Sequence, residues 1–326
     1  MPGDGGALRV HMSRVVVATA YGGPEVLAVT DEPTAAPGPG EVRITVRASG
    51  VNPVDYKVYS GAMGADPGRL PLRIGSEAAG QVTEVGPEAV GPAGPVAVGD
   101  EVIAFRVTGA YAAELVVPAQ ALVPKPPDLG WAEASGLMLA GATAWHALAA
   151  TRLDAGDTVL VHGAAGGVGL MAIQLAAARG ATVIGTASPA KHKLLREFGA
   201  IPVAYGDGLA DRVAAAAPDG VTAALDLVGT DEAVDVSLAL VTDRERIATI
   251  AAARRGLDLG IRVLGGAPGA DPGTDIRAAA RLELARLAGQ GRLRVLVAQT
   301  FPLENAADAH RLSMGGHVAG KLVLTP

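Results

Sequence analysis

Cysteine is absent from this chain of 326 residues. Disulfide bonds and thiolate metal sites are therefore excluded, and the composition fits a reducing compartment, so we expect a cytoplasmic protein. Runs of basic residues are also absent, and the formal net charge is −6, which argues against a nucleic-acid partner. We expect no metal site, because the six histidines fall on different predicted elements without ligand spacing. They stand at positions 11, 146, 162, 192, 310 and 317.

Membrane-spanning segments are not expected either. Two stretches, Ala134–Thr151 and Thr158–Ala178, are free of charge over a length that would suit a membrane helix. Glycines and polar side chains interrupt both, so we interpret them as buried parts of a soluble fold. The first eleven residues lack the apolar segment of a signal peptide. The sequence therefore predicts no membrane partner.

A glycine-rich turn lies at the centre of the sequence pattern. Thr158–Val161 is an apolar, β-branched run typical of a buried strand, and apolar residues follow at helical spacing from Leu170 to Ala177. The glycines between them have the spacing G-x-x-G-G-x-G instead of G-x-G-x-x-G. Strand, glycine turn and helix together predict a site for a dinucleotide pyrophosphate, with an ordinary tight turn as the alternative. The glycines are Gly163, Gly166, Gly167 and Gly169.

The pattern on either side of this turn predicts two domains. From Ser13 to Lys125, short apolar runs separated by Pro and Gly indicate a β-barrel or curled sheet. Beyond the prolines at 124, 126 and 127, strands and helices alternate, which predicts a doubly wound parallel sheet. The helices expected there include one over Trp131–Ala150 and one over Asp231–Leu240. The last strands have no such partner helix and are expected to rejoin the first domain. We therefore predict one domain of residues 13–127 with 290–326, and a second of residues 128–289.

Six short motifs follow one another along the chain, and together they resemble the medium-chain dehydrogenase/reductase superfamily. The resemblance runs from Val15 to Pro326 and is strongest to the zinc-independent branch of quinone oxidoreductases and enone reductases. It implies an α/β protein with a GroES-like β-barrel catalytic domain and a Rossmann domain. The motifs are Gly50–Lys57 (GVNPVDYK), Gly75–Gly80 (GSEAAG), Gly99–Val102 (GDEV), Gly109–Glu114 (GAYAAE), Thr158–Gly169 and Gly320–Leu324 (GKLVL).

One departure narrows the expected chemistry. Ser76 stands where zinc-containing members carry a histidine, and the chain has no cysteine ligand. The resemblance thus implies a zinc-independent reductase that passes hydride from NADPH to a small quinone or α,β-unsaturated carbonyl. Two alternatives stay open: an enoyl-thioester reductase of a polyketide or fatty-acid pathway, and an NADPH-binding protein without turnover. The family also implies a homodimer, with residues 246–263 as the expected contact region.

The end of the second Rossmann strand favours NADP(H) over NAD(H). An NAD site usually has an acidic residue there for the ribose hydroxyls, whereas Gly185–Lys191 contains none. By resemblance, Ser188, Lys191 and Tyr205 occupy positions that contact the 2′-phosphate or the adenosine. Ser188 also fits a helix cap, and Lys191 a solvated cation.

The other cofactor-binding candidates come from the turn, the strand ends and the family motifs. Parallel sheets bind ligands at the carboxyl ends of their strands, which selects Val228, Gly229 and Ile250. The resemblance places Asn52 and Thr143 beside the nicotinamide, although Thr143 also fits a buried helix hydroxyl. Completing the set are Ala165, Gly166, Gly167 and Val168 of the turn, and Lys321 of the last motif.

Reduction of the acceptor requires stabilisation of negative charge on its oxygen. Asn52, Tyr56 and Tyr59 are the catalytic candidates, as an amide and two phenols that could donate to that oxygen. Each also has a structural explanation. Asn52 could serve only to form an Asn-Pro turn, and the two tyrosines could serve only to pack against their neighbours. No single catalytic acid is assigned, since solvent could supply the proton.

Overall fold

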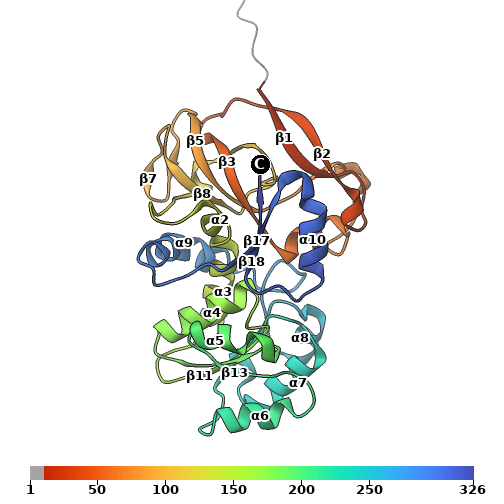
Figure 1. The fold of residues 1–326 in the computed structure, drawn as a ribbon, viewed down its shortest axis with the longest axis vertical. Coiled ribbons are helices and arrows are strands. Elements are labelled where there is room, and N and C mark those ends of the chain that lie inside the picture. The colour runs from red at the N-terminus through yellow and green to blue at the C-terminus, as the bar shows by residue number, and fades with distance from the viewer. Residues whose placement is uncertain (1–10) are drawn as a thin grey trace, which may run out of the picture. The chain divides into compact units, whose positions relative to one another are not determined.

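The computed structural model describes residues 11–326 and forms two compact units (Figure 1). Residues 1–10 lie outside the described residues. The expectation of no signal peptide concerns almost the same segment, the first eleven residues. Unit 1 runs to Lys125 and adds Thr300–Met314 and Val323–Pro326. Unit 2 contains Pro126–Gln299 and Gly315–Leu322. The chain returns to unit 1 about ten residues later than the sequence pattern suggested, and residues 315–322 group with unit 2.

Unit 1 is built from short antiparallel strands (Figure 1). They are β1 (His11–Ala18), β2 (Leu27–Thr34), β3 (Glu41–Val51), β4 (Leu72–Arg73), β5 (Glu77–Val85), β6 (Val90–Gly91), β7 (Gly94–Pro95), β8 (Glu101–Phe105), β9 (Glu114–Pro118) and β10 (Leu122–Pro124). β1 pairs with β2 and β4. In the larger sheet, β3 pairs with β5 and β9, and β5 pairs with β8. That sheet also includes β17 (Val297–Pro302) and β18 (Lys321–Thr325). Alternate apolar residues of these strands form the core of the unit.

Two helices of unit 1 carry polar side chains inward. Helix α1 (Pro53–Tyr59) has Pro53 at its first position, where a proline costs no hydrogen bond. Asn52 caps it, and the Asp55 carboxylate accepts a hydrogen bond from the Asn52 main-chain nitrogen at 2.9 Å. This reciprocal capping fixes the start of the helix. Helix α10 (Ala306–Met314) packs against α1 and β3.

Unit 2 contains a six-stranded parallel sheet in the order β13-β12-β11-β14-β15-β16. Its strands are β11 (Thr158–His162), β12 (Thr182–Thr186), β13 (Ile201–Val203), β14 (Ala223–Asp226), β15 (Ile247–Thr249) and β16 (Arg262–Val263). The central strands are buried along almost their whole length, as expected for a parallel sheet covered on both faces. The strand order reverses between β11 and β14. This reversal creates the switch point at which such sheets bind ligands.

The helices of unit 2 account for the two uncharged stretches. They are α2 (Trp131–Ser135), α3 (Met138–Ala150), α4 (Gly167–Ala178), α5 (His192–Glu197), α6 (Leu209–Ala216), α7 (Asp231–Leu240), α8 (Ala253–Leu259) and α9 (Thr274–Gly289). Most residues of α3 and α4 are buried, and the two helices pack on each other. No helix in residues 11–326 has both the length and the apolar character to cross a membrane. A single helix was expected over 131–150, but it is divided at Gly136, against which the Lys321 side chain packs.

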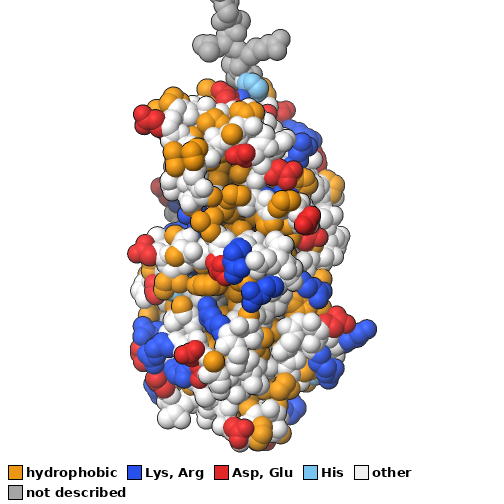
Figure 2. All heavy atoms as spheres, turned by 90° about the vertical axis from the view of Figure 1, so that its left-hand side faces the viewer, with side chains coloured by type: hydrophobic (Ala, Val, Ile, Leu, Met, Phe, Trp, Pro, Cys, Tyr) orange, Lys and Arg blue, Asp and Glu red, His pale blue; other side chains and the backbone are white. Residues whose placement is uncertain are grey.

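Charges of both signs are mixed on one face of the molecule. On the face drawn in Figure 2, Lys and Arg side chains lie among Asp and Glu side chains, without a continuous basic area. Local ion pairs contribute to this mixing, for example Arg255 with Asp231 at 2.6 Å. Exposed pairs of this kind add little stability. The expectation of no nucleic-acid partner rests on the overall charge and stays a prediction.

Candidate functional site

The glycine turn between β11 and α4 forms a cradle that a side chain would fill. A Cβ on Gly169 would lie 2.5 Å from the main-chain oxygens of Gly163 and Ala164. Gly163 has a φ of +71°, in the left-handed region that glycine adopts without strain. α4 begins at Gly167, and no side chain caps its N-terminus. Main-chain N–H groups at such a helix start lack intrahelical acceptors and attract anions, so the turn fits a pyrophosphate.

The segment 315–321 is tied to this turn. The main-chain nitrogen of Gly320 donates to the oxygen of Ala165 at 2.9 Å, and Gly320 forms a β-bridge with Gly166. The Lys321 side chain covers the next glycine, since a Cβ on Gly167 would lie 2.8 Å from its Cδ. Lys321, selected from its motif alone, therefore lies beside the glycine turn.

The residues expected at the 2′-phosphate lie just beyond β12 and β13. Ser188 precedes a short 3-10 turn (Pro189–Lys191) without a side-chain capping bond. The Lys191 ammonium donates to the main-chain oxygen of His317 at 2.6 Å, and partial burial lowers its pKa from the ordinary value. Tyr205 follows β13, and 53% of it is exposed. The group thus offers a hydroxyl, a cation and an accessible aromatic ring.

Asp226 organises the loop after β14, although sequence reasoning did not select it. Its Oδ1 accepts hydrogen bonds from the main-chain nitrogens of Val228 at 3.1 Å and Gly229 at 2.7 Å. Its Oδ2 accepts from the Thr249 hydroxyl at 2.7 Å. That hydroxyl in turn accepts from the nitrogens of the loop after β15, at Ala251 and Ala252. The loops that carry Val228, Gly229 and Ile250 are therefore held together by one buried carboxylate. A polar residue ending an apolar strand was the available sequence signal.

His162 ends β11 at the same edge of the sheet. It is 1% exposed, and burial lowers its pKa to about 4, so it is neutral at physiological pH. Its Nδ1 lies 3.4 Å from the Thr186 hydroxyl, at the end of β12. Its Nε2 has no hydrogen-bond partner among the described residues.

Thr143 takes part in a chain of hydrogen bonds between α3 and α9. The Arg277 guanidinium donates to the Thr143 hydroxyl oxygen and to Nδ1 of His146, each at 3.3 Å. Because Nδ1 accepts a hydrogen bond, the neutral His146 carries its proton on Nε2, which lies 3.2 Å from the Asp271 carboxylate. Burial lowers the pKa of His146, in keeping with this neutral form. The Thr143 oxygen is thus an acceptor toward Arg277, which leaves its hydrogen to be donated in another direction.

In unit 1, Asn52 and Asp55 belong to a buried polar network. The Asn52 amide donates to the Glu77 carboxylate at 2.9 Å, and the Ser76 hydroxyl donates to Asp55 Oδ1 at 2.8 Å. Asn52 is 2% exposed and Glu77 is fully buried. These donors and acceptors bind one another, and no group of three or more His, Asp or Glu side chains in residues 11–326 is arranged to hold a metal ion. The residues at the position of the zinc ligands therefore do not fit a zinc ion.

The two candidate tyrosines, Tyr56 and Tyr59, and the nearby Tyr111 differ in their surroundings. Tyr59 is fully buried, and its hydroxyl bonds to Nδ1 of His310 at 2.8 Å. Burial raises the pKa of Tyr59 above its ordinary value. Tyr56 is only partly buried, and burial raises its pKa as well. The Tyr111 hydroxyl donates to Asp55 Oδ2 at 2.9 Å. Because Tyr59 is enclosed and bonded to a histidine, Tyr56 is the better placed of the two expected donors.

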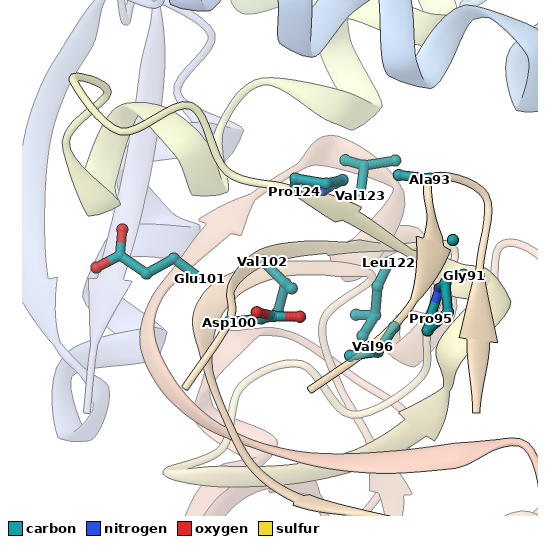
Figure 3. Close-up of a pocket in the computed structure, with 11 residues that line it drawn as sticks. Gly91, Ala93, Pro95, Val96, Asp100, Glu101, Val102, Leu122, Val123 and Pro124 are labelled. Carbon is teal, nitrogen blue, oxygen red and sulfur yellow. The ribbon is translucent and has the colours of Figure 1, made fainter. Parts of the chain in front are cut away.

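A separate small pocket of unit 1 lies among β6, β7, β8 and β10 (Figure 3). Apolar side chains such as Val102 and Leu122 line most of it, together with Asp100. The Asp100 carboxylate accepts a hydrogen bond from the main-chain nitrogen of Ala97 at 2.9 Å. None of the predicted site residues lines this pocket, so we assign it no role.

Known proteins resemble the chain over nearly its whole length. Family models match in two regions: an alcohol dehydrogenase GroES-like domain at residues 38–127 and a zinc-binding dehydrogenase at residues 198–324. A quinone oxidoreductase from Pseudomonas aeruginosa is 37% identical over 97% of this chain and all of its own length. The spectinabilin polyketide synthase system protein NorB from Streptomyces orinoci is 35% identical over 92% of the chain, which corresponds to 14% of that protein.

The fold comparison agrees with the sequence comparison. The crystal structure of Escherichia coli quinone oxidoreductase complexed with NADPH has a TM-score of 0.84, with 28% identity over 96% of this chain and all of that one. The GroES-like and Rossmann architecture expected from the motifs is therefore confirmed. The chain belongs to the quinone oxidoreductase family, within the medium-chain dehydrogenase/reductase superfamily of oxidoreductases.

Proposed function

We propose that the protein is an NADPH-dependent, zinc-independent reductase that transfers hydride to a quinone or to the C=C bond of an α,β-unsaturated carbonyl. The observation that carries this proposal is the glycine cradle of unit 2, followed by a strand end with Ser188 and Lys191 and no acidic residue. The similarity to the E. coli quinone oxidoreductase solved with NADPH supports the choice of cofactor.

The residues of unit 2 would hold the cofactor in three parts. The turn Ala165–Val168 receives the pyrophosphate, and Ser188, Lys191 and Tyr205 receive the 2′-phosphate and adenosine. Thr143 and the loops at Val228–Gly229 and Ile250 receive the nicotinamide end, with Lys321 supporting the turn. When bound, NADPH supplies the hydride. Asp226 and Arg277 contribute by holding these loops and the Thr143 hydroxyl in place.

The residues of unit 1 would act on the acceptor. Hydride addition leaves negative charge on a carbonyl or quinone oxygen, and a donor aimed at that oxygen lowers the barrier. We assign this role to the Tyr56 phenol. The Asn52 amide orients the reacting groups, and its own position is fixed by Glu77. A raised pKa keeps the Tyr56 phenol protonated, as a hydrogen-bond donor must be.

A panel of acceptors tests the proposal. NADPH oxidation is followed with quinones, enones and enoyl thioesters, and turnover with a quinone or enone is expected. Preference for an enoyl thioester would favour the second candidate, which the similarity to a polyketide synthase segment supports. NADPH binding without turnover of any acceptor would overturn both and leave a binding protein.

The Tyr56 assignment has its own test. Tyr56→Phe should lower kcat at least about tenfold, since each 1.36 kcal/mol of lost transition-state stabilisation is tenfold in rate, and leave the Kd for NADPH unchanged. Tyr21→Phe is the matched control in the same unit, because the Tyr21 hydroxyl bonds to Asp66 instead. Unchanged turnover of Tyr56→Phe would make this residue a packing residue.

We further propose that the protein is a cytoplasmic homodimer. An edge strand exposes main-chain groups that a second copy can pair with. β16 is one of the two edge strands of the parallel sheet, and Asp271 covers only its end at Leu264. Sedimentation should give twice the mass of one chain. A monomeric wild-type protein would contradict this proposal.

A further inference from the structure

His310 is a fully buried histidine that the proposed reaction does not use directly. It lies on α10 in unit 1, and each of its ring nitrogens lies within hydrogen-bond distance of a tyrosine hydroxyl. Nδ1 is 2.8 Å from the Tyr59 hydroxyl and Nε2 is 3.1 Å from the Tyr111 hydroxyl. The rings also meet: the Tyr111 ring is perpendicular to the imidazole, with centroids 5.7 Å apart. A histidine with two phenol partners in a dry core is held in one orientation.

The number of available hydrogens fixes the direction of each bond. Tyr111 has one hydroxyl hydrogen, and it is donated to Asp55 Oδ2 at 2.9 Å. The Tyr111 oxygen can therefore only accept from His310, which places the imidazole proton on Nε2. Nδ1 is then an acceptor and receives the hydrogen of Tyr59. The result is a chain of donated bonds from Tyr59 to His310, Tyr111 and Asp55.

The histidine and the two tyrosines have the protonation states that this chain of hydrogen bonds requires. Burial lowers the pKa of His310 to about 4, so the imidazole is neutral. Burial raises the pKa of Tyr59 and of Tyr111, so both phenols keep their hydrogens. A fully satisfied buried network of this kind rigidifies the elements that it connects.

This chain of hydrogen bonds holds helix α1 at both of its ends. Tyr59 is the last residue of the helix and bonds to His310 directly. Asp55 lies in its first turn and is reached through Tyr111, while also accepting from Asn52 and Ser76. Tyr56 lies between these two points on the same helix. Its ring meets the imidazole edge-on, with centroids 6.4 Å apart.

We propose that His310 is a positioning residue that aligns Tyr56 for donation to the acceptor, by fixing helix α1 through Tyr59 and through Tyr111 to Asp55. This inference rests on the proposed function for the role of Tyr56. His310 itself does not touch the acceptor. It sets the orientation of the helix from which the phenol projects, and small misalignments of a catalytic group lower rates strongly.

Substitutions at His310 separate positioning from packing. His310→Phe keeps a ring but removes both hydrogen bonds, and should lower kcat/KM for the acceptor about tenfold while the Kd for NADPH stays within about twofold. His310→Gln retains one donor and one acceptor, and should recover most of the activity. A loss in His310→Gln that equals or exceeds the loss in His310→Phe would overturn the proposal, because the hydrogen bonds would then contribute nothing and packing alone favours Phe over Gln.

A double-mutant cycle provides the decisive readout. In a Tyr56→Phe background, His310→Phe should have little further effect on kcat/KM, because the phenol that it positions is already gone. A His310 effect that persists at full size would overturn the positioning role and leave the proposed function intact. Unchanged activity of Tyr56→Phe alone would instead overturn the donor role of Tyr56 and, with it, this inference.

The hydrogen-bond chain can also be examined without turnover. Nitrogen NMR of the histidine side chains at pH 7 should find His310 protonated on Nε2 and unprotonated on Nδ1. The His310→Gln variant identifies the signal by its loss. A proton on Nδ1, or on both nitrogens, would contradict the chain of donors and overturn the proposal, whatever the acceptor is.

Discussion

The ammonium group of Lys191 donates a hydrogen bond to the main-chain oxygen of His317 at 2.6 Å. This bond joins the end of the 3-10 turn after β12 to the segment 315–321, which is also tied to the glycine turn at Ala165. The cation expected to bind a 2′-phosphate is thus held beside the pyrophosphate cradle by unit 2 itself.

Lys191→Met should weaken NADPH binding selectively. A charge-assisted hydrogen bond is worth about 1.5–3 kcal/mol, so the Kd for NADPH should rise roughly 10- to 100-fold, whereas the Kd for NADH should change little. Lys193→Met is the matched control, because the Lys193 side chain is 89% exposed and pairs only loosely with Glu197 at 3.9 Å. Fluorescence titration with both cofactors measures the effect. Equal weakening of NADPH and NADH would remove Lys191 from the phosphate site.

Gly169→Ala should damage the pyrophosphate cradle. The added Cβ would lie 2.5 Å from two main-chain oxygens, so the turn must move. We expect NADPH affinity to fall at least about tenfold, together with a loss of stability of about 1–3 kcal/mol from overpacking. Gly167→Ala is the comparison, because its Cβ would lie close to a side chain only, Lys321 at 2.8 Å, with the nearest main-chain oxygen at an ordinary contact distance of 3.6 Å. Calorimetric titration and thermal unfolding should rank the two variants in this order, and equal effects would contradict the cradle.

Much of this fold could be predicted because apolar periodicity and glycine placement are local signals. Helix α7 begins and ends where the sequence pattern indicated, at Asp231 and Leu240, and the strand–turn–helix at the glycine turn is present. The single helix expected over 131–150 was wrong, because Gly136 packs against Lys321, a contact across 185 positions of sequence. Packing between distant segments leaves no local signal.

The candidate site likewise has a part that local sequence patterns predict and a part that they do not. The cradle follows from glycine spacing, whereas Asp226, His310 and Arg277 escaped notice. His310 and Arg277 act through partners far away in sequence: Tyr59 and His310 are 251 positions apart, and Arg277 and Thr143 are 134 apart. Asp226 binds the two residues of its own loop and Thr249, 23 positions on, at the end of the neighbouring strand. The sequence of a C-terminal helix does not show whether its histidine is buried or exposed, because burial depends on the other segments that pack against it.

Thr143→Val should weaken binding of the nicotinamide end of the cofactor. Valine has the same shape but no hydroxyl, so it removes a donor worth about 1 kcal/mol and leaves the Arg277 guanidinium short of one acceptor. We expect the Kd for NADPH to rise about fivefold, with recovery in Thr143→Ser, which restores the hydroxyl. Stopped-flow binding measures both. If Ser and Val behave alike, the hydroxyl has no role and only the branched shape matters.

His162 should make the protein less stable in acid. Its folded-state pKa is about 4, against about 6.5 for an exposed histidine, so between these values the unfolded chain binds more protons than the folded one. The free energy of unfolding should therefore fall as pH drops from about 6.5 toward 4, by up to about 3 kcal/mol from this residue. His162→Asn cannot take up the proton, and should flatten the dependence of the urea midpoint on pH between 7 and 5. His317→Asn, at an exposed position, is the control and should leave the slope unchanged. The idea fails if His162→Asn retains the wild-type slope, because the acid sensitivity would then come from other groups.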